Sequence, residues 1–506
     1  MLLLSCASAL AAGVLSQPTR DVNDDGFDDL VAGVPYEDNG ATTESGGVLV
    51  LRGGSSGATG ASSTSWDQDT PGVDDSVATY DIAGNVVATG DFNGDGYADV
   101  VMGVPGEDSA AGAAGAGAIN VLYGTSSGLT ATVIADLYLD QDSSAVEGNG
   151  EDADAFGAAL AVADFNGDGY DDLAAGVPGE DDEGAVAVIY GGSGGLSASA
   201  VVADQRWDQD VADVEGTAEV ADDFGVALAA GDFDGDGYGD LAIGVPGEDA
   251  DAGSVNVIYG STVGLAADGD QVWNQDSSGI EGSAESGDRF GALLAVGDFD
   301  GDGYADLAVG APDEDVGAAS AAGGVNVIYG SSAGLDASGD QVWTQDSSGI
   351  VDSAEGDDRF GDALATADIN GDGYDELLVG VPGEDVGVAT SAGGLHVIFG
   401  STSGSTASGD VFYTQNTAGV EDSAETNDTF GYSLGAGDFN GDGYDDVVVG
   451  VPGEETGAVL DAGALHVFPG ARGGLSSSAD AVLDQDSPRV VGSNETGDGL
   501  GVALVR

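Results

Sequence analysis

A nine-residue acidic motif recurs seven times in this 506-residue chain and constrains its fold more than any other feature. The second copy reads DFNGDGYAD, with oxygen-bearing side chains at positions one, three, five and nine and glycine at position six. Such oxygen ligands suit a hard cation such as Ca²⁺, and glycine tolerates the positive φ of a sharp turn. The motif therefore predicts a calcium loop.

The seven copies are spaced 66 to 73 residues apart and begin at Asp21, Asp91, Asp164, Asp232, Asp298, Asp368 and Asp438. A constant period indicates one repeated supersecondary unit, whereas length alone would suggest roughly three unrelated domains. We therefore expect a single repeat domain over residues 21–506.

Each repeat contains four short segments typical of β-strands. In the fifth copy they are 289–297, 304–312, 323–330 and 340–346, each rich in β-branched or aromatic residues and bounded by glycine or acidic turns. A helical interpretation fails because glycine interrupts every run. Seven units of four antiparallel strands predict an all-β fold, a seven-bladed β-propeller.

The two ends of the repeat region distinguish a closed ring from an open stack of sheets. The segment GDGLGVALVR (497–506) matches GDRFGALLAV (287–296), which is a first strand alone, while the first repeat has no convincing first strand before Asp21. We therefore expect the C-terminal strand to complete the first blade. A closed ring leaves no exposed sheet edges.

The predicted metal ligands are the residues at positions one, three, five and nine of each loop, with the backbone carbonyl at position seven. The alternative is seven Asx-turn hairpins that carry solvated acids. Glu376 departs from the pattern, although its longer side chain could still reach the ion. The ligands are Asp21, Asn23, Asp25, Phe27 and Asp29; Asp91, Asn93, Asp95, Tyr97 and Asp99; Asp164, Asn166, Asp168, Tyr170 and Asp172; Asp232, Asp234, Asp236, Tyr238 and Asp240; Asp298, Asp300, Asp302, Tyr304 and Asp306; Asp368, Asn370, Asp372, Tyr374 and Glu376; and Asp438, Asn440, Asp442, Tyr444 and Asp446.

The order FG, then DFNGDGYxD, then GxP resembles the FG-GAP repeat of integrin α-subunit propellers and related bacterial surface proteins. The resemblance extends from Asp21 to the C-terminus. In integrins the corresponding propeller binds protein ligands through the face opposite its calcium loops, so the resemblance implies a similar use here. FG-GAP propellers also accompany a phospholipase D and some polysaccharide-degrading enzymes.

The charge balance narrows the range of partners. Eight arginines and no lysine stand against 92 acidic residues, which gives a net charge of −84. Seven bound Ca²⁺ would still leave about −70, so nucleic acid and anionic membranes are not expected partners. Cys6 is the only cysteine, so no disulfide can form within the chain, and we expect the calcium loops to act as cross-links instead. Extracellular calcium modules bind at roughly 10⁻⁴ to 10⁻³ M, and cytosolic calcium is too scarce to fill weak loops, so export is expected.

Residues 1–20 have three interpretations. The apolar run with small residues is typical of an export signal, although it lacks a basic start. Leu3-Leu4-Ser5-Cys6 resembles a bacterial lipobox, which would place a lipid anchor on Cys6. ALAAG at 9–13 repeats residues 227–231 and could instead be a truncated strand. No other segment is long and apolar enough to span a membrane.

Three further recurring features favour structure over catalysis. PGED-like turns after each second strand are expected on the face opposite the loops, mainly as solvated acids. The tryptophans share one repeat position and are expected in the core. His396 and His466 occupy a strand position filled elsewhere by asparagine, and no GxSxG elbow is present.

The sequence thus predicts a non-catalytic, calcium-binding module at the cell surface or in the medium, with a protein or glycan as its ligand. The alternatives are an accessory or catalytic propeller of an extracellular hydrolase that acts on phospholipids or polysaccharides, and a structural matrix protein.

Overall fold

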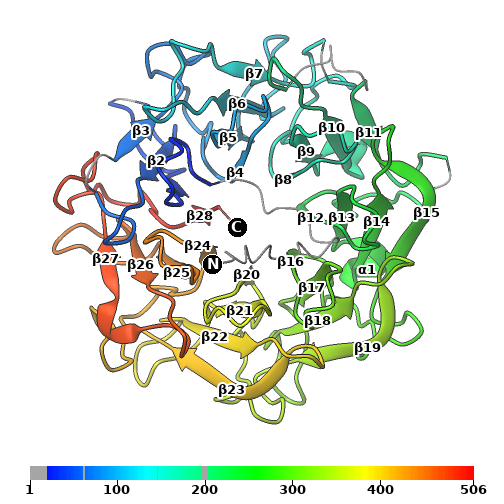
Figure 1. Ribbon diagram of the computed structural model, residues 1–506, viewed down its shortest axis with the longest axis vertical. Coiled ribbons are helices and arrows are strands. Elements are labelled where there is room, and N and C mark those ends of the chain that lie inside the picture. Colours follow the sequence, from blue (N-terminus) through cyan, green and yellow to red (C-terminus); the bar gives the residue numbers. More distant parts are fainter. Residues whose placement is uncertain are drawn as a thin grey trace, which may run out of the picture.

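A computed structural model describes residues 20–40, 42–60, 63–144, 146–196, 203–212 and 214–505. Seven four-stranded antiparallel sheets surround a central channel (Figure 1). The predicted seven-bladed β-propeller is therefore confirmed. The helical elements within the described residues are single turns: η1 (Glu180–Asp182), α1 (Glu248–Asp251) and η2 (Ser477–Ala479).

Each blade starts with its innermost strand at the channel and ends with its outermost strand at the rim (Figure 1). From inside to outside, the first four blades are β28 (Ala503–Leu504), β1 (Leu30–Gly33), β2 (Val48–Leu51) and β3 (Thr64–Trp66); β4 (Val87–Gly90), β5 (Asp99–Val104), β6 (Ala118–Leu122) and β7 (Leu137–Leu139); β8 (Leu160–Ala163), β9 (Asp172–Val177), β10 (Ala185–Ile189) and β11 (Gln205–Trp207); and β12 (Ala227–Gly231), β13 (Asp240–Val245), β14 (Ser254–Tyr259) and β15 (Ala266–Trp273).

The last three blades follow the same order. They are β16 (Leu293–Gly297), β17 (Asp306–Ala311), β18 (Gly324–Tyr329) and β19 (Asp336–Trp343); β20 (Ala363–Ala367), β21 (Glu376–Val381), β22 (Gly394–Phe399) and β23 (Thr406–Tyr413); and β24 (Ser433–Gly437), β25 (Asp446–Val451), β26 (Ala464–Phe468) and β27 (Ala481–Leu483).

The C-terminal strand β28 completes the first blade, as the sequence predicts. It pairs antiparallel with β1, with Ala32 opposite Leu504 and Gly33 opposite Ala503. Strands from the two ends of the repeat region thus form one sheet, which closes the ring.

The FG segment of each repeat joins its blade to the preceding one. The backbone N–H of Phe290, for example, donates to the carbonyl of Ala252 at 3.1 Å, and the Phe290 ring is fully buried. Ala83 and Leu500 replace the phenylalanine at the two junctions that the first blade makes with its neighbours, yet both make the same backbone bridge. These departures therefore preserve the junction between blades.

The core lies between neighbouring sheets. The six residues of β5 and the six of β13 are all buried, because each second strand is covered on both faces by adjacent blades. One core cluster combines Phe92 of the second repeat with Phe156 and Leu173 of the third. Stability is therefore shared between blades, as expected of a repeat array.

The tryptophan prediction is only partly right. Trp207 is buried, with 6% of its surface exposed, and packs in the core between two blades. Trp66, Trp273 and Trp343, at the same position on the outermost strands of other blades, are half-buried. They pack against the edge of the core.

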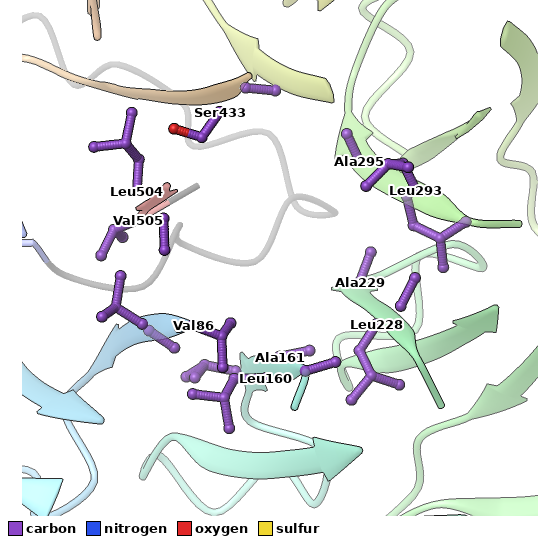
Figure 2. Close-up of a pocket in the computed structure, with 18 of the residues that line it drawn as sticks. Val86, Leu160, Ala161, Leu228, Ala229, Leu293, Ala295, Ser433, Leu504 and Val505 are labelled. Carbon is purple, nitrogen blue, oxygen red and sulfur yellow. The ribbon is translucent and has the colours of Figure 1, made fainter. Parts of the chain in front are cut away.

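The innermost strands enclose a central cavity of about 420 Å³ (Figure 2). Its lining is mostly small and apolar, and includes Val86, Leu160, Ala229 and Leu504. Such a lining offers few groups for chemistry.

No helix in the described part of the chain has the length and apolar character needed to cross a membrane.

Replacing Phe290 with alanine should lower the free energy of unfolding by about 3–5 kcal/mol, because a fully buried ring is lost at a junction between blades. Urea denaturation would measure this change. Val263→Ala is the control, since Val263 is 64% exposed and its loss should have little effect. Equal effects of the two substitutions would contradict the interblade role of the FG segment.

Candidate metal centres

In six repeats the acidic loop connects the innermost strand of a blade to its second strand, and in the first repeat the loop precedes β1. In the fourth repeat the loop leaves β12 at Gly231 and enters β13 at Asp240. Position nine is therefore the first residue of a buried strand, and Asp240 itself is fully buried. The glycine at position six has a φ of 85–90° in all seven loops, as in Gly237, which confirms the predicted sharp turn.

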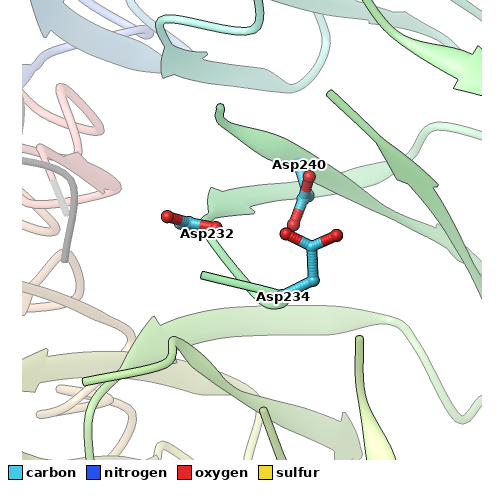
Figure 3. Close-up of side chains that lie close together, drawn as sticks. All are labelled: Asp232, Asp234 and Asp240. Atoms are coloured by element: carbon cyan, nitrogen blue, oxygen red, sulfur yellow. The ribbon is translucent and has the colours of Figure 1, made fainter. Parts of the chain in front are cut away.

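The fourth and fifth loops bring three carboxylates together. Asp232, Asp234 and Asp240 each offer one oxygen, and these oxygens lie within 4.8 Å of one another (Figure 3). Asp298, Asp300 and Asp306 form the same group in the next blade. Positions one, three and nine thus gather around a common point, in the way expected of ligands of one cation.

The position-five side chain lies outside this group. The Asp236 Oδ1 accepts the backbone N–H of Tyr238 at 3.0 Å, and Asp302 does the same for Tyr304. Its role as a metal ligand, like that of the position-seven carbonyl, stays a prediction. The geometry shows directly that it stabilises the loop.

The other five loops have asparagine at position three, and its Nδ2 donates to the acid at position nine. The shortest Nδ2–O distances are 3.1 Å for Asn23–Asp29, 3.5 Å for Asn93–Asp99, 3.3 Å for Asn166–Asp172, 2.6 Å for Asn370–Glu376 and 2.9 Å for Asn440–Asp446. Positions three and nine are therefore adjacent here too. A half-turn of the amide would present its oxygen to a cation instead.

Backbone N–H groups hold the acids at positions one and nine. In the fourth loop, Asp232 accepts the N–H groups of Asp236 at 3.1 Å and Gly237 at 3.0 Å. Asp240 accepts the N–H groups of Phe233 and Gly260, both at 2.8 Å. The carboxylates are therefore positioned by the strand and the turn, independently of any ion.

Glu376 reaches the same neighbours as the aspartates at its position. Its Oε2 accepts the N–H of Ile369 at 3.0 Å. The other six loops add a bond from a glycine after the third strand, such as Gly260, and no equivalent bond from Gly400 is found within the described residues. The longer side chain thus leaves this loop less firmly held.

Burial is the main cause of a raised pKa at position nine in every loop, and the nearby carboxylates add to it. The pKa rises to about 6 in Asp29, to about 7 in Asp446, to about 8 in Asp99, Asp172, Asp240 and Asp306, and to about 9 in Glu376. The ionised form is therefore disfavoured unless positive charge is supplied. The donors and the electrostatics both fit a divalent cation.

Position eight carries a role that the sequence analysis missed. In four loops an aspartate there accepts the position-one N–H of the preceding loop around the ring: Asp171 from Asp91 at 2.8 Å, Asp375 from Asp298 at 2.8 Å, Asp445 from Asp368 at 3.2 Å, and Asp28 from Asp438 at 3.0 Å. The other three loops have Ala98, Gly239 and Ala305. The available signal was that position eight is aspartate in four loops and alanine or glycine in the other three.

The remaining predicted features fall on the structure as follows. The PGED turns follow the far ends of the second strands, as Glu107 follows β5, and so lie opposite the loops. The expectation that they carry solvated acids is wrong for four glutamates, which are buried: Glu107, Glu180, Glu384 and Glu454. His396 and His466 are fully buried and contact Asp410 at 3.3 Å and Asp480 at 3.0 Å. The predicted signal, including Cys6, lies outside the described residues except for Arg20.

Comparison with known proteins agrees with this architecture. A family model described as "FG-GAP repeat" matches seven segments that together cover slightly more than half of the chain: 17–51, 83–122, 156–189, 224–258, 290–328, 360–398 and 430–468. Every segment except the first begins at or near an FG motif or its replacement, and each contains one acidic loop.

Individual relatives match only in part. Integrin alpha-PS2 of Drosophila melanogaster is 30% identical over 51% of this chain, and integrin alpha-7 of Rattus norvegicus is 34% identical over 31%. The phosphatidylinositol-glycan-specific phospholipase D of Rattus norvegicus is 36% identical over 31%. The matches span 17%, 12% and 18% of these relatives, so the chain corresponds to less than a fifth of each.

In metal-free buffer the stability of the protein should fall as the pH rises from about 4 to about 8. The acids at position nine have a higher pKa when folded than when unfolded, so the stability that their protons confer is present at low pH and is lost as the pH rises through the folded pKa. Thermal melts across this range in excess chelator would measure the fall.

The Asp306→Asn variant is expected to show a smaller fall because it removes one of these buried acids. Asp336→Asn is the matched control, since Asp336 is exposed on a strand of the same blade. Stability that rises with pH in chelator would contradict the electrostatic account.

Proposed function

The chain belongs to the FG-GAP repeat family, and from this we propose that it is an exported, calcium-stabilised β-propeller that binds another macromolecule without transforming it. The observation that carries the proposal is the cluster of three carboxylate oxygens within 4.8 Å in the fourth and fifth loops. Buried acids so close together need a counter-ion, and the donors are hard oxygens.

Up to seven Ca²⁺ ions would bind, one in each loop, with the ligands named from the sequence. The residues at positions one, three and nine supply the central oxygens, and backbone N–H groups hold them in place. Bound calcium would supply positive charge between the acids and link the turn to the second strand. The free energy of binding would then contribute directly to folding.

A binding role is supported by how chemistry-bearing groups are distributed. The acidic loops and the PGED turns repeat around both faces, and they differ little from blade to blade. The central cavity is lined mainly by alanine, valine and leucine. A surface that repeats from blade to blade in this way supports recognition of a protein or glycan.

The second candidate function is a part of a hydrolase. The similarity to the phosphatidylinositol-glycan-specific phospholipase D over 31% of the chain favours it. On that proposal the propeller would position a catalytic partner on a lipid or polysaccharide substrate. A structural role in an extracellular matrix is the third candidate, and calcium-induced self-association would support it.

Export follows from the calcium proposal, because weak loops fill only where calcium is abundant. Extracellular calcium modules bind at roughly 10⁻⁴ to 10⁻³ M. The net charge of −84 points the same way, since the ions of an extracellular medium would screen the repulsion. We therefore propose the cell surface or the medium as the place of action.

Chelation should lower the melting temperature substantially. A ligand that binds only the folded state adds about 2.7 kcal/mol per site at 100 times its dissociation constant. Differential scanning calorimetry with calcium and with excess chelator would measure the shift. Asp234→Ala should remove one calcium equivalent by equilibrium dialysis, and Asp268→Ala, at an exposed position in the same blade, should remove none. A melting temperature that is the same with calcium and with excess chelator would contradict the calcium proposal.

The binding role is tested with the full chain on arrays of extracellular proteins and glycans, in calcium and in chelator. We expect saturable binding that depends on calcium. The same preparation is assayed for turnover of phospholipids and polysaccharides. Turnover that persists after purification to homogeneity would favour the hydrolase candidate over the binding module.

A further inference from the structure

A second ring of acids, four of them buried and three half-buried, lies at the opposite face, where each PGED turn meets the preceding blade. A glutamine from one blade donates its Nε2 to the glutamate of the next, at 2.6–2.9 Å in six of the pairs. The pairs are Gln68–Glu107, Gln141–Glu180, Gln209–Glu248, Gln275–Glu314, Gln345–Glu384, Gln415–Glu454 and Gln485–Glu37. These bonds join all seven blades.

The other half of each amide is unsatisfied. The Oε1 atom of all seven glutamines is buried and accepts no hydrogen bond. Gln68, Gln345 and Gln415 are each only 1% exposed. A buried carbonyl oxygen without a donor is costly, and turning the amide over would bring this oxygen to the side that faces the carboxylate.

Three of the junctions add a second carboxylate. The residue seven positions after the glutamine is aspartate in Asp75, Asp352 and Asp422, and glycine in Gly148, Gly216, Gly282 and Gly492. All seven have positive φ, between 73° and 94° for the aspartates. That conformation is natural for glycine and unfavourable for aspartate, so the side chain is kept at a cost in backbone energy.

The side chain at this position is directed at the amide. A Cβ atom added to the four glycines would lie 2.5–3.4 Å from the Nε2 of the glutamine seven residues earlier. In the aspartate junctions burial raises the pKa of the glutamate, and the aspartate lies close enough for its negative charge to help raise it: Asp75 with Glu107, Asp352 with Glu384, and Asp422 with Glu454. One aspartate oxygen is held by the next backbone N–H, as Asp352 is by Ser353 at 2.9 Å.

One glycine junction shows that a cation fits beside this glutamate. The Arg206 guanidinium lies 3.4 Å from Glu180 and 3.5 Å from Asp181. The described ion pairs place no arginine at the three aspartate junctions. There two acids face each other beside an unsatisfied amide oxygen, and the glutamates are only 4–6% exposed.

We propose that a divalent cation, Ca²⁺ in a calcium-rich medium, binds at these three junctions, held by the aspartate, the glutamate and the glutamine Oε1. The amide turns over so that its oxygen faces the ion, and water completes the coordination. With three protein donors the sites are weak, on the order of 10⁻⁴ to 10⁻³ M. They link blade one to two, five to six and six to seven, and they do not depend on the loop sites.

The test compares Asp352→Gly with the reciprocal Gly282→Asp. Equilibrium dialysis against Ca²⁺ should show a loss of one equivalent in Asp352→Gly, a loss of three in the variant with glycine at 75, 352 and 422, and a gain of one in Gly282→Asp. In excess chelator the Asp352→Gly protein should melt higher than the wild type, because strain and repulsion are relieved. With calcium present that advantage should shrink or reverse.

Two outcomes would overturn the proposal. One is unchanged calcium stoichiometry in the triple variant. The other is a gain in melting temperature that is equal with and without calcium, which would mean that the paired acids share a proton instead. Asp234→Ala separates the two classes of site, since it removes a loop equivalent and leaves the junction equivalents in place.

Discussion

The structure depends on how it manages repulsion between carboxylates that are held close together and away from water. In six of the seven loops the first residue of a buried strand is an acid, and in the fourth and fifth loops two more carboxylates converge on it. Backbone N–H groups offset part of this repulsion, but they carry only partial charge. A fold built on such points is at its most stable only when positive charge is present.

Three kinds of contact join neighbouring blades, and they lie at different places along the blades. The FG segments bridge backbone to backbone, the position-eight aspartates connect one loop to the next, and the glutamine–glutamate pairs connect the blades at the other face. Every junction between blades has the first and third kinds of contact, so the blades are joined in the same way around the ring. The second kind occurs at four junctions only, so pairs of loops differ in how strongly they are coupled.

Much of this architecture could be predicted from the sequence because its signals are local and repeated. The period, the four strands, the sharp glycine turn and the closing strand could all be recognised within short windows. The role of Asp171 and the setting of Asp352 could not, because each depends on a contact with another blade. The burial of the tryptophans was predicted only in part for a related reason: a shared repeat position shows that the residues are equivalent between blades, but it does not show how far each one is buried.

The pairing of β28 with β1 has a consequence for how the molecule is made. Because β28 is the last strand in chain order, its pairing with β1 can form only after the strands of all the other blades have been synthesised. Closure of the ring by β28 is thus the last step in forming the propeller.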